Sequence, residues 1–354
     1  MVDAFSLAGK TGFFLSRAYG PVTRCAPGLY RLFYNLSDRH PGLQSRVTAA
    51  LIRRRFLALI AAFRPDLILN LHPLSGGGVL NILESRKIGI PVITLLADLT
   101  HMNSCWFDAR NLLTLCPTPD SLEQGLRMGI PEEKLRLVGF PVRMDFTEAA
   151  RRAAPRVYEE GKPLRCLLMS GAECTGDPEK YALQLLEHVD CRLTVICGRN
   201  EKLLRRLNRN LVPRYGDRIR VLGFRDNIWE HMMDSDIVIA RASPNVMMEA
   251  AVMNVPLIIT GALPGQEAEN PALIRSLNLG AVCTDPASIP FTIEQLTRDH
   301  GRVMEEIRKS QRAWLDPDAA GKIVSLILDC CESFTGSFQK QYAVQGSPSG
   351  GTNM

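Results

Sequence analysis

Short apolar runs alternate with longer amphipathic segments along most of this chain. The runs are rich in Val, Ile and Leu and are bounded by Gly, Pro or charged residues, which is typical of strands buried in a parallel sheet. They form two series, separated by a segment rich in Ala, Arg, Pro and Glu. We expect strands at 66–71, 92–97, 112–116 and 135–138 in the first series, and at 164–170, 192–197, 236–240, 255–260 and 281–284 in the second.

Strand–helix alternation of this kind predicts an α/β fold with two doubly wound parallel sheets, one for each series. We place the first domain at residues 1–146, a linker at 147–162 and the second domain at 163–315. A further helix is expected at 316–335. The tail 336–354 is rich in Gly, Ser and Gln and is expected to be disordered.

The first 64 residues hold ten Lys or Arg and two Asp, whereas the whole chain has a net charge of only +5. Aromatic residues lie between these arginines, and Pro21, Pro27 and Pro41 predict several short helices. A basic and aromatic surface suits the headgroup layer of an anionic membrane. A solvated helical face is the simpler alternative. Nucleic acid is not favoured as a partner, because no recognised binding motif accompanies the charge.

The overall composition, 46% hydrophobic and 22% charged over 354 residues, is that of an ordinary soluble protein. No apolar run approaches the roughly 18 residues of a membrane-spanning helix, and the first residues lack the pattern of a signal peptide. The ten cysteines include no CxxC pair, so neither a zinc site nor a disulfide framework is predicted. The cytosol, or the cytoplasmic face of a membrane, is the expected location.

A helix start lies between the expected strands 236–240 and 255–260. Ser243 can cap a helix and the proline after it suits the first turn. The backbone N–H groups that follow would face the carboxyl edge of the sheet, where an anion binds. These donors belong to Asn245, Val246 and Met247.

Two further groups of polar side chains follow this helix start. Glu249 lies one turn along, where a carboxylate could accept bonds from ribose hydroxyls. Gln266, Glu267 and Asn270 follow the next strand and suit a polyhydroxylated ligand. A plain helix cap and a solvated loop would explain the same residues without any ligand.

In the first series, His72, Asp98 and the Gly76–Gly78 run fall at the carboxyl ends of expected strands, where doubly wound sheets bind ligands. The glycines could cradle a phosphate. They lack the Lys of a P-loop, however, so a glycine-rich helix start is the simpler interpretation.

Seven motifs support a specific resemblance. They are DLTHMNSCWF at 98–107, GFPVR at 139–143, GAECTG at 171–176, CGRNEKL at 197–203, GFRDN at 223–227, RASPNVMMEA at 241–250 and PGQEAEN at 264–270. Together they resemble the monogalactosyldiacylglycerol synthase and processive diacylglycerol glucosyltransferase family of GT-B glycosyltransferases. They are similar, more distantly, to the N-acetylglucosaminyltransferase that makes lipid II. The resemblance implies two Rossmann-like domains facing a cleft, with a terminal helix that crosses back to the first.

The resemblance also implies the reaction. A hexose would pass, with inversion, from UDP-galactose or UDP-glucose to diacylglycerol at a membrane surface, without a metal or other cofactor. We expect the amides of the helix start, with Arg199 or Arg241, to bind the diphosphate, and the PGQEAEN loop to hold the sugar. The expected donor-binding residues are Gly198, Arg199, Asn200, Phe224, Asn227, Arg241, Ser243, Asn245, Val246, Met247, Glu249, Gln266, Glu267 and Asn270.

The acceptor hydroxyl needs a base, for which Asp98 is the first candidate and His101 the second. The position at which the family carries His is Asn103 here.

Other departures concern the first domain. The first strand of the family and its GGGH loop are missing, and the first five residues resemble the second strand. We therefore expect an N-terminally incomplete first domain and a chain that binds UDP but transfers sugar poorly or not at all, unless the true start lies upstream of Met1. Transfer to another lipid, such as a polyprenyl-linked sugar, and a non-catalytic relative that binds nucleotide sugar or membrane are the alternatives.

Overall fold

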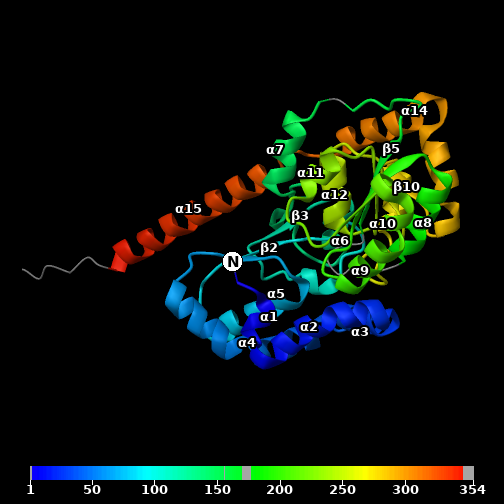
Figure 1. Ribbon diagram of the computed structural model, residues 1–354. Coiled ribbons are helices and arrows are strands. Elements are labelled where there is room, and N and C mark those ends of the chain that lie inside the picture. Colours follow the sequence, from blue (N-terminus) through cyan, green and yellow to red (C-terminus); the bar gives the residue numbers. More distant parts are fainter. Residues whose placement is uncertain (1, 155, 170–176, 346–354) are drawn as a thin grey trace, which may run out of the picture.

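The computed structural model describes residues 2–154, 156–169 and 177–345, so the GAECTG motif lies outside the described residues. Two separate sheets organise it (Figure 1). All paired strands are parallel, which confirms the prediction of two parallel-sheet α/β domains. The first sheet has the order β1 (Ile68–Asn70), β2 (Val92–Leu95), β3 (Leu113–Cys116), β4 (Leu135–Leu137).

The second sheet has the order β10-β9-β8-β5-β6-β7. The sequence pattern did not predict β7, because Arg220 interrupts its short apolar run. The bounds are β5 (Leu164–Met169), β6 (Cys191–Ile196), β7 (Ile219–Leu222), β8 (Ile237–Ala240), β9 (Leu257–Ile259) and β10 (Gly280–Val282).

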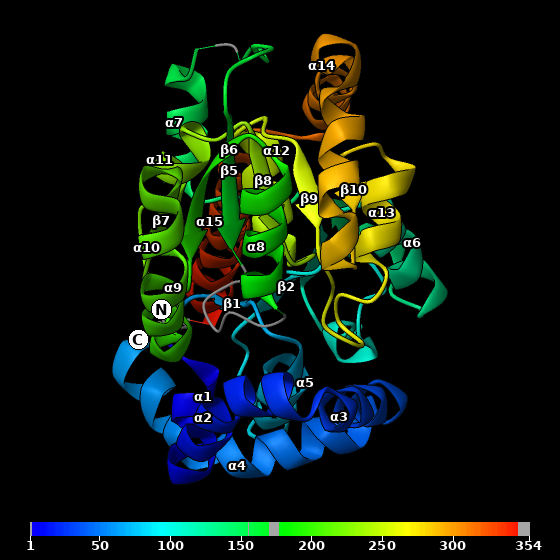
Figure 2. The same cartoon turned by 45° about the vertical axis from the view of Figure 1, so that its right-hand side comes forward.

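Helices cover both faces of the second sheet (Figure 2). Helices α8 and α14 pack on one face, and α7, α11 and α12 pack with the apolar side chains of the other. The bounds are α7 (Met144–Arg152), α8 (Pro178–His188), α9 (Glu201–Asn210), α10 (Val212–Tyr215), η3 (Gly216–Arg218), α11 (Ile228–Met233), α12 (Pro244–Val252), α13 (Asn270–Ser276), η4 (Pro286–Ser288), α14 (Ile289–Trp314) and α15 (Ala319–Gln345).

The first 63 residues form a helical layer beside the first sheet, at the bottom of the molecule in Figures 1 and 2. Pro27 and Pro41 begin new helices as expected, whereas Pro21 lies inside α2. The layer contains α1 (Ala4–Leu7), α2 (Gly9–Cys25), α3 (Pro27–Arg39) and α4 (Pro41–Phe63), and the sheet carries α5 (Pro73–Ser85), η1 (Ser104–Trp106), α6 (Pro119–Arg127) and η2 (Glu132–Lys134).

The N-terminal residues form a helix, so the expectation that they form a strand is wrong. The Asp3 carboxylate accepts the Phe5 N–H at 2.9 Å and caps α1. The glycine run also differs from the expectation of a loop or helix start, because it lies inside α5, buried against α4. A side chain at Gly78 would meet Thr48 at 2.7 Å. These glycines therefore allow two helices to approach closely.

The predicted linker 147–162 begins within a helix. Helix α7 occupies its first part, and Phe146 is fully buried with the second-domain side chains that cover β8. Further along, the Arg156 guanidinium donates to three carbonyl groups near the end of α11: those of Met233 at 2.8 Å, Ser235 at 2.5 Å and Met232 at 2.9 Å. Arg156 thus ties the connection to the second domain.

Replacing Arg156 with Ala is expected to lower the free energy of unfolding by about 3 kcal/mol, because several carbonyl groups lose a charged donor. Burial lowers the pKa of Arg156 to about 10, so the side chain is still charged at neutral pH. Urea denaturation followed by circular dichroism measures the change. Arg152→Ala, at a side chain that is 80% exposed, is the control. Equal midpoints for the two variants would contradict this role.

Helix α15 follows the second domain in the chain but packs on the first sheet. Its Ile323 is buried with Ile93, Leu115 and Val138. The helix continues to Gln345, so the disordered tail expected from residue 336 is wrong for 336–345. Helix-breaking Gly, Ser and Pro residues are concentrated only from 346 onward, which lies outside the described residues.

Candidate active site between the two sheets

Asp98 lies just beyond β2 and is 2% exposed. Its two carboxylate oxygens have different partners: Trp106 Nε1 donates to Oδ2 at 3.0 Å, and Gln266 Nε2 donates to Oδ1 at 2.7 Å. Burial raises the pKa of Asp98, and these two hydrogen bonds oppose the rise. The group is therefore a carboxylate whose basicity depends on its partners.

Gln266 belongs to the second domain, so its bond to Asp98 crosses between the domains. A second crossing bond lies nearby, where the Thr100 hydroxyl donates to Asn270 Oδ1 at 2.7 Å. The amide of Asn270 in turn donates to the Ala242 carbonyl at 2.8 Å. The loop after β2, the PGQEAEN loop and the segment before α12 thus meet at one place, as the doubly wound sheets predict.

Glu267 and Arg241 pair with each other. Arg241 Nε lies 3.0 Å from Glu267 Oε2, and the same oxygen accepts the Leu263 N–H at 2.8 Å. Burial raises the pKa of Glu267, and the Arg241 charge opposes this. In this arrangement the two residues shape the loop, and their roles toward sugar and diphosphate stay predictions.

The first turn of α12 contains the backbone N–H groups that are expected to bind an anion. Ser243 precedes the helix with extended backbone, although its hydroxyl does not cap it. The Met247 N–H donates to the Ser243 carbonyl at 2.9 Å and is therefore already used. The N–H groups of Asn245 and Val246 have no acceptor in the preceding turn of a helix. Among the described residues, two of the three expected amides thus remain for an anion.

Glu249 lies one turn into α12, with 14% of its side chain exposed. Its Oε1 is 3.5 Å from Arg143 Nε, which belongs to the GFPVR motif. Burial raises the pKa of Glu249 to about 7, and Arg143 opposes the rise.

The other residues expected to bind the UDP-sugar lie at the carboxyl ends of β6 and β7. In the sheet, these strands lie on the other side of β5 from β8, which leads into α12. Gly198 has a positive φ of 55°, and Asn200 caps α9 by accepting the Leu203 N–H at 3.0 Å. The Arg199 guanidinium stacks over the Phe224 ring, 4.9 Å from its centroid, and Phe224 is 46% exposed. Asn227 donates to the Glu230 carboxylate. These residues therefore form a group separate from Asp98.

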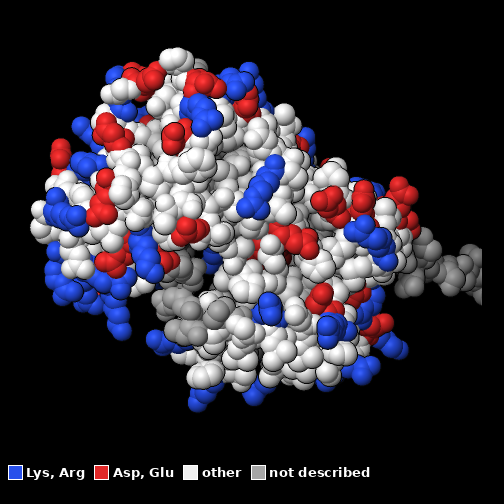
Figure 3. All heavy atoms as spheres, turned by 90° about the vertical axis from the view of Figure 1, so that its right-hand side faces the viewer, with Lys and Arg blue, Asp and Glu red and all other residues white. Residues whose placement is uncertain are grey.

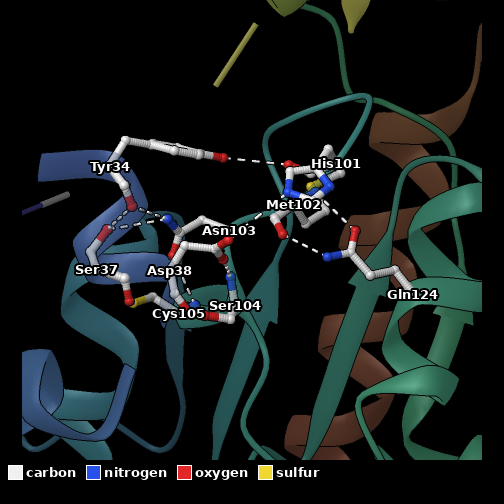
Figure 4. A network of polar contacts seen from close by, with 9 residues as sticks. All are labelled: Tyr34, Ser37, Asp38, His101, Met102, Asn103, Ser104, Cys105 and Gln124. Atoms are coloured by element: carbon white, nitrogen blue, oxygen red, sulfur yellow. Dashed lines mark hydrogen bonds and ion pairs between the residues drawn. The ribbon is translucent and has the colours of Figure 1, made fainter. Parts of the chain in front are cut away.

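His101 does not join Asp98 in the structure. Its side chain is 54% exposed, and Nε2 lies 3.9 Å from Asp38 Oδ2 on α3 (Figure 4). Asn103, at the position of the family His, is buried. It donates to the Tyr34 carbonyl at 3.3 Å and to Ser37 Oγ at 3.2 Å. Asn103 thus anchors the loop after β2 on α3.

Other bonds strengthen this attachment of the loop to α3, as Figure 4 shows. The Ser104 N–H donates to Asp38 Oδ1 at 2.7 Å, and Tyr34 OH donates to the His101 carbonyl at 3.4 Å. Our reading of the sequence missed these α3 residues. The available signal is the spacing of Tyr30, Tyr34 and Ser37, which places three polar groups on one helical face.

An apolar cavity of about 300 Å³ lies against α3. His72 is at its rim, where it caps α5 and packs edge-on against the Phe5 ring. The described residues contain no helix long and apolar enough to cross a bilayer. Apolar cavity-lining side chains include Phe33, Leu36, Leu43, Val47, Leu51 and Ile52.

Comparisons with known proteins agree with this geometry. The monogalactosyldiacylglycerol synthase family model matches residues 5–142, and the glycosyltransferase family 28 C-terminal domain model matches residues 177–270. The chloroplastic monogalactosyldiacylglycerol synthase of Spinacia oleracea is 27% identical over 327 residues, 88% of this chain and 62% of its own length. The processive diacylglycerol beta-glucosyltransferase of Bacillus cereus is 25% identical over 307 residues, 85% of this chain and 77% of its own. The chain thus spans less than two thirds of the spinach protein.

Solved structures share the fold. MurG of Acinetobacter baumannii superposes with a TM-score of 0.56 at 17% identity, over 80% of this chain and 79% of its own. The UDP-GlcNAc 2-epimerase of Neisseria meningitidis, bound to UDP-GlcNAc, gives 0.59 at 16% identity, over 80% and 82%. Residues 5–142 are therefore similar to the monogalactosyldiacylglycerol synthase family and residues 177–270 to the glycosyltransferase family 28 C-terminal domain, and the two parallel-sheet domains have the GT-B fold.

Proposed function

We propose that this protein transfers a hexose from UDP-galactose or UDP-glucose to diacylglycerol, as a peripheral protein on the cytoplasmic face of a membrane. The observation that carries the proposal is the 2.7 Å bond between Gln266 and Asp98. It brings the candidate base of one domain against the candidate sugar loop of the other. The names of the spinach and Bacillus relatives support both the sugar transfer and the lipid acceptor.

The reaction follows from these positions. The acceptor hydroxyl attacks the anomeric carbon from the face opposite UDP, the new C–O bond forms as the bond to the diphosphate breaks, and UDP leaves with the electron pair. Asp98 takes the hydroxyl proton, helped by the rise in its pKa that burial causes. The N-terminus of α12 stabilises the negative charge that develops on the diphosphate.

The apolar cavity supports a lipid acceptor. It lies on α3, the same helix that binds the loop after β2 through Tyr34, Ser37 and Asp38. An acyl chain held in this cavity would keep the glycerol end of the lipid near that loop. Water-soluble sugar acceptors would have no use for an apolar cavity at this position.

The helical layer of residues 1–63 supports membrane docking. Basic side chains gather along the underside of the lower lobe in Figure 3. Large apolar side chains of α2, α3 and α4 are exposed on this layer, which suits contact with the headgroup and acyl boundary of a bilayer. The most exposed of them are Phe13, Phe14, Leu29, Leu32, Phe33, Leu36, Leu43, Val47 and Phe63.

Product analysis tests the proposal. The purified chain is incubated with diacylglycerol in anionic vesicles and with radiolabelled UDP-galactose or UDP-glucose, and lipids are separated by thin-layer chromatography. We expect labelled monohexosyldiacylglycerol from one of the two donors. UDP binding without any labelled lipid would contradict the proposal and favour a non-catalytic relative.

Replacing Glu249 with Ala is expected to weaken UDP binding about 10- to 150-fold at pH 8, because a charged hydrogen bond to the ribose contributes about 1.5–3 kcal/mol. The pKa of about 7 also sets a pH dependence. The carboxylate is lost as the pH falls through 7, so affinity should drop about tenfold from pH 8 to pH 6 if only the ionised form binds. Calorimetry with UDP measures both effects.

Two variants control this measurement. Glu249→Gln should lose the part of the pH dependence that Glu249 contributes, and Glu306→Ala, on the exposed face of α14, should bind UDP like the native chain. Unchanged affinity in Glu249→Ala would mean that Glu249 serves only to pair with Arg143.

A further inference from the structure

Three side chains form a line of hydrogen bonds from the helical layer to Asp98. The Tyr30 hydroxyl on α3 donates to Gln266 Oε1 at 3.1 Å, and Gln266 Nε2 donates to Asp98 Oδ1 at 2.7 Å. Tyr30 and Asp98 belong to the first domain, whereas Gln266 belongs to the second. The amide of Gln266 is therefore held at both ends by the opposite domain.

The Tyr30 hydroxyl holds this amide in the orientation that suits the ionised carboxylate of Asp98. A glutamine amide has an acceptor oxygen at one end and two donors at the other, and an ionised carboxylate can only accept. With the Tyr30 hydroxyl bonded to the oxygen, the NH₂ group points at Asp98. If the amide turned over, its oxygen would face the carboxylate, and the bond that stabilises the ionised form would be lost.

Few other charged groups face Asp98 among the described residues. Glu267 is close enough to interact with it, and its charge is paired with Arg241 at 3.0 Å. The Tyr34 phenol on α3 also interacts with it, since burial and then the charge of Asp98 raise the pKa of that phenol. The bonds from Gln266 and Trp106 are thus the main favourable contacts of the carboxylate.

We propose that Tyr30 is a positioning residue that directs Gln266 onto Asp98, and that a bound donor hexose draws Gln266 away and releases the base. This inference rests on the proposed function, in which Gln266 binds the sugar. Before the donor binds, Gln266 stabilises the ionised carboxylate and makes it a weaker base. Once hexose hydroxyls take the amide, Oδ1 is free and the carboxylate binds a proton more strongly. The acceptor hydroxyl is then deprotonated only when a donor is in place.

Trp106 offers a direct probe, because its indole N–H donates to the other oxygen of Asp98 at 3.0 Å. In the ¹⁵N-labelled full chain, the indole signal of Trp106, assigned with a Trp106→Phe variant, should follow the protonation of Asp98 as the pH is varied. Tyr30→Phe keeps the ring and removes the hydroxyl. We expect it to raise the midpoint of this titration by about 0.5–1 pH unit, because a Gln266 amide that Tyr30 no longer holds bonds the charged carboxylate less well.

Two variants make the result specific. Gln266→Ala should raise the midpoint at least as much, and adding Tyr30→Phe to it should change nothing further, because Tyr30 acts through Gln266. Tyr215→Phe removes a comparable phenol bond, to Glu187 Oε1 at 3.2 Å on the surface, and should leave the midpoint unchanged. An unchanged midpoint in Tyr30→Phe, or an equal rise in Tyr215→Phe, would overturn the positioning role.

Donor binding is tested on the same signal. Saturating UDP-galactose or UDP-glucose should raise the midpoint of the native chain and remove its difference from Tyr30→Phe, whereas UDP alone should leave that difference in place. If calorimetry shows that a UDP-hexose binds and the difference persists, the release of Asp98 is refuted. If neither UDP-hexose binds, the proposed function fails, while the ligand-free comparison still decides whether Tyr30 positions Gln266.

Discussion

Asp98→Asn is expected to lower the rate of hexose transfer about 10²- to 10⁴-fold, the range over which a positioned general base contributes. The amide cannot take the hydroxyl proton at any pH at which the protein is folded. Asn keeps the shape of the side chain, so the bond from Trp106 can persist through its oxygen. Because the α12 N-terminus is unaffected, UDP affinity should stay within twofold of the native value.

Initial rates of lipid glycosylation and calorimetry with UDP measure these two quantities on the same preparation. Asp120→Asn, on the exposed first turn of α6, is the matched control and should have the native rate. If Asp98→Asn transfers hexose at the native rate, another group removes the proton. His101 then becomes the first candidate, through movement of the loop that α3 holds.

Charge reversal of Arg17, Arg31 and Arg39 to Glu is expected to reduce binding to anionic vesicles at least 100-fold. Each basic residue near such a surface contributes about 1 kcal/mol, so loss of three attractive charges alone removes about 3 kcal/mol. All three side chains are exposed on α2 and α3. Cosedimentation with vesicles of phosphatidylglycerol and phosphatidylcholine measures the partition coefficient.

Salt provides an independent check, because exposed charges are screened at high ionic strength. Binding of the native chain should weaken steeply between 0.05 and about 0.5 M salt. The triple variant Arg127, Arg152 and Arg205 to Glu changes the same number of exposed charges outside the helical layer, and it should bind like the native chain. If vesicle binding changes neither on charge reversal of Arg17, Arg31 and Arg39 nor on addition of salt, these helices serve only to pack on the first domain.

The strands and the α12 region were predictable because their signals are local. β8 and β9 are continuous apolar runs. The dipeptide of Ser243 and the following proline marks the start of α12, with Ser243 in the position before the helix. The PGQEAEN loop was placed correctly for a similar reason, since it follows directly from β9. Periodicity and turn chemistry are sufficient where neighbours in the chain decide the structure.

The contacts of the site were harder to predict because they join residues that are far apart in the chain. The bond from Tyr30 to Gln266 spans 236 positions, and the pairing of Arg241 with Glu267 depends on how a loop folds back. The early helix was missed because Asp3 caps a segment that is too short for a clear period. Asn103 illustrates a further limit. The family has His at this position, and the change to Asn does not by itself indicate that the side chain bonds to α3.

The chain passes between the domains twice, and the two passages touch. The first follows Gly139, and the second leads into α15. A side chain at Gly139 would meet Ala319 at 3.0 Å and Asp316 at 3.3 Å, at a backbone φ of 78° that also favours glycine. Two adjacent covalent connections restrict the relative motion of the two domains. They resist twisting of one domain against the other and permit mainly hinge opening and closing about one axis. Opening would then separate Thr100 from Asn270 and Asp98 from Gln266 together, so donor and acceptor gain entry in one movement.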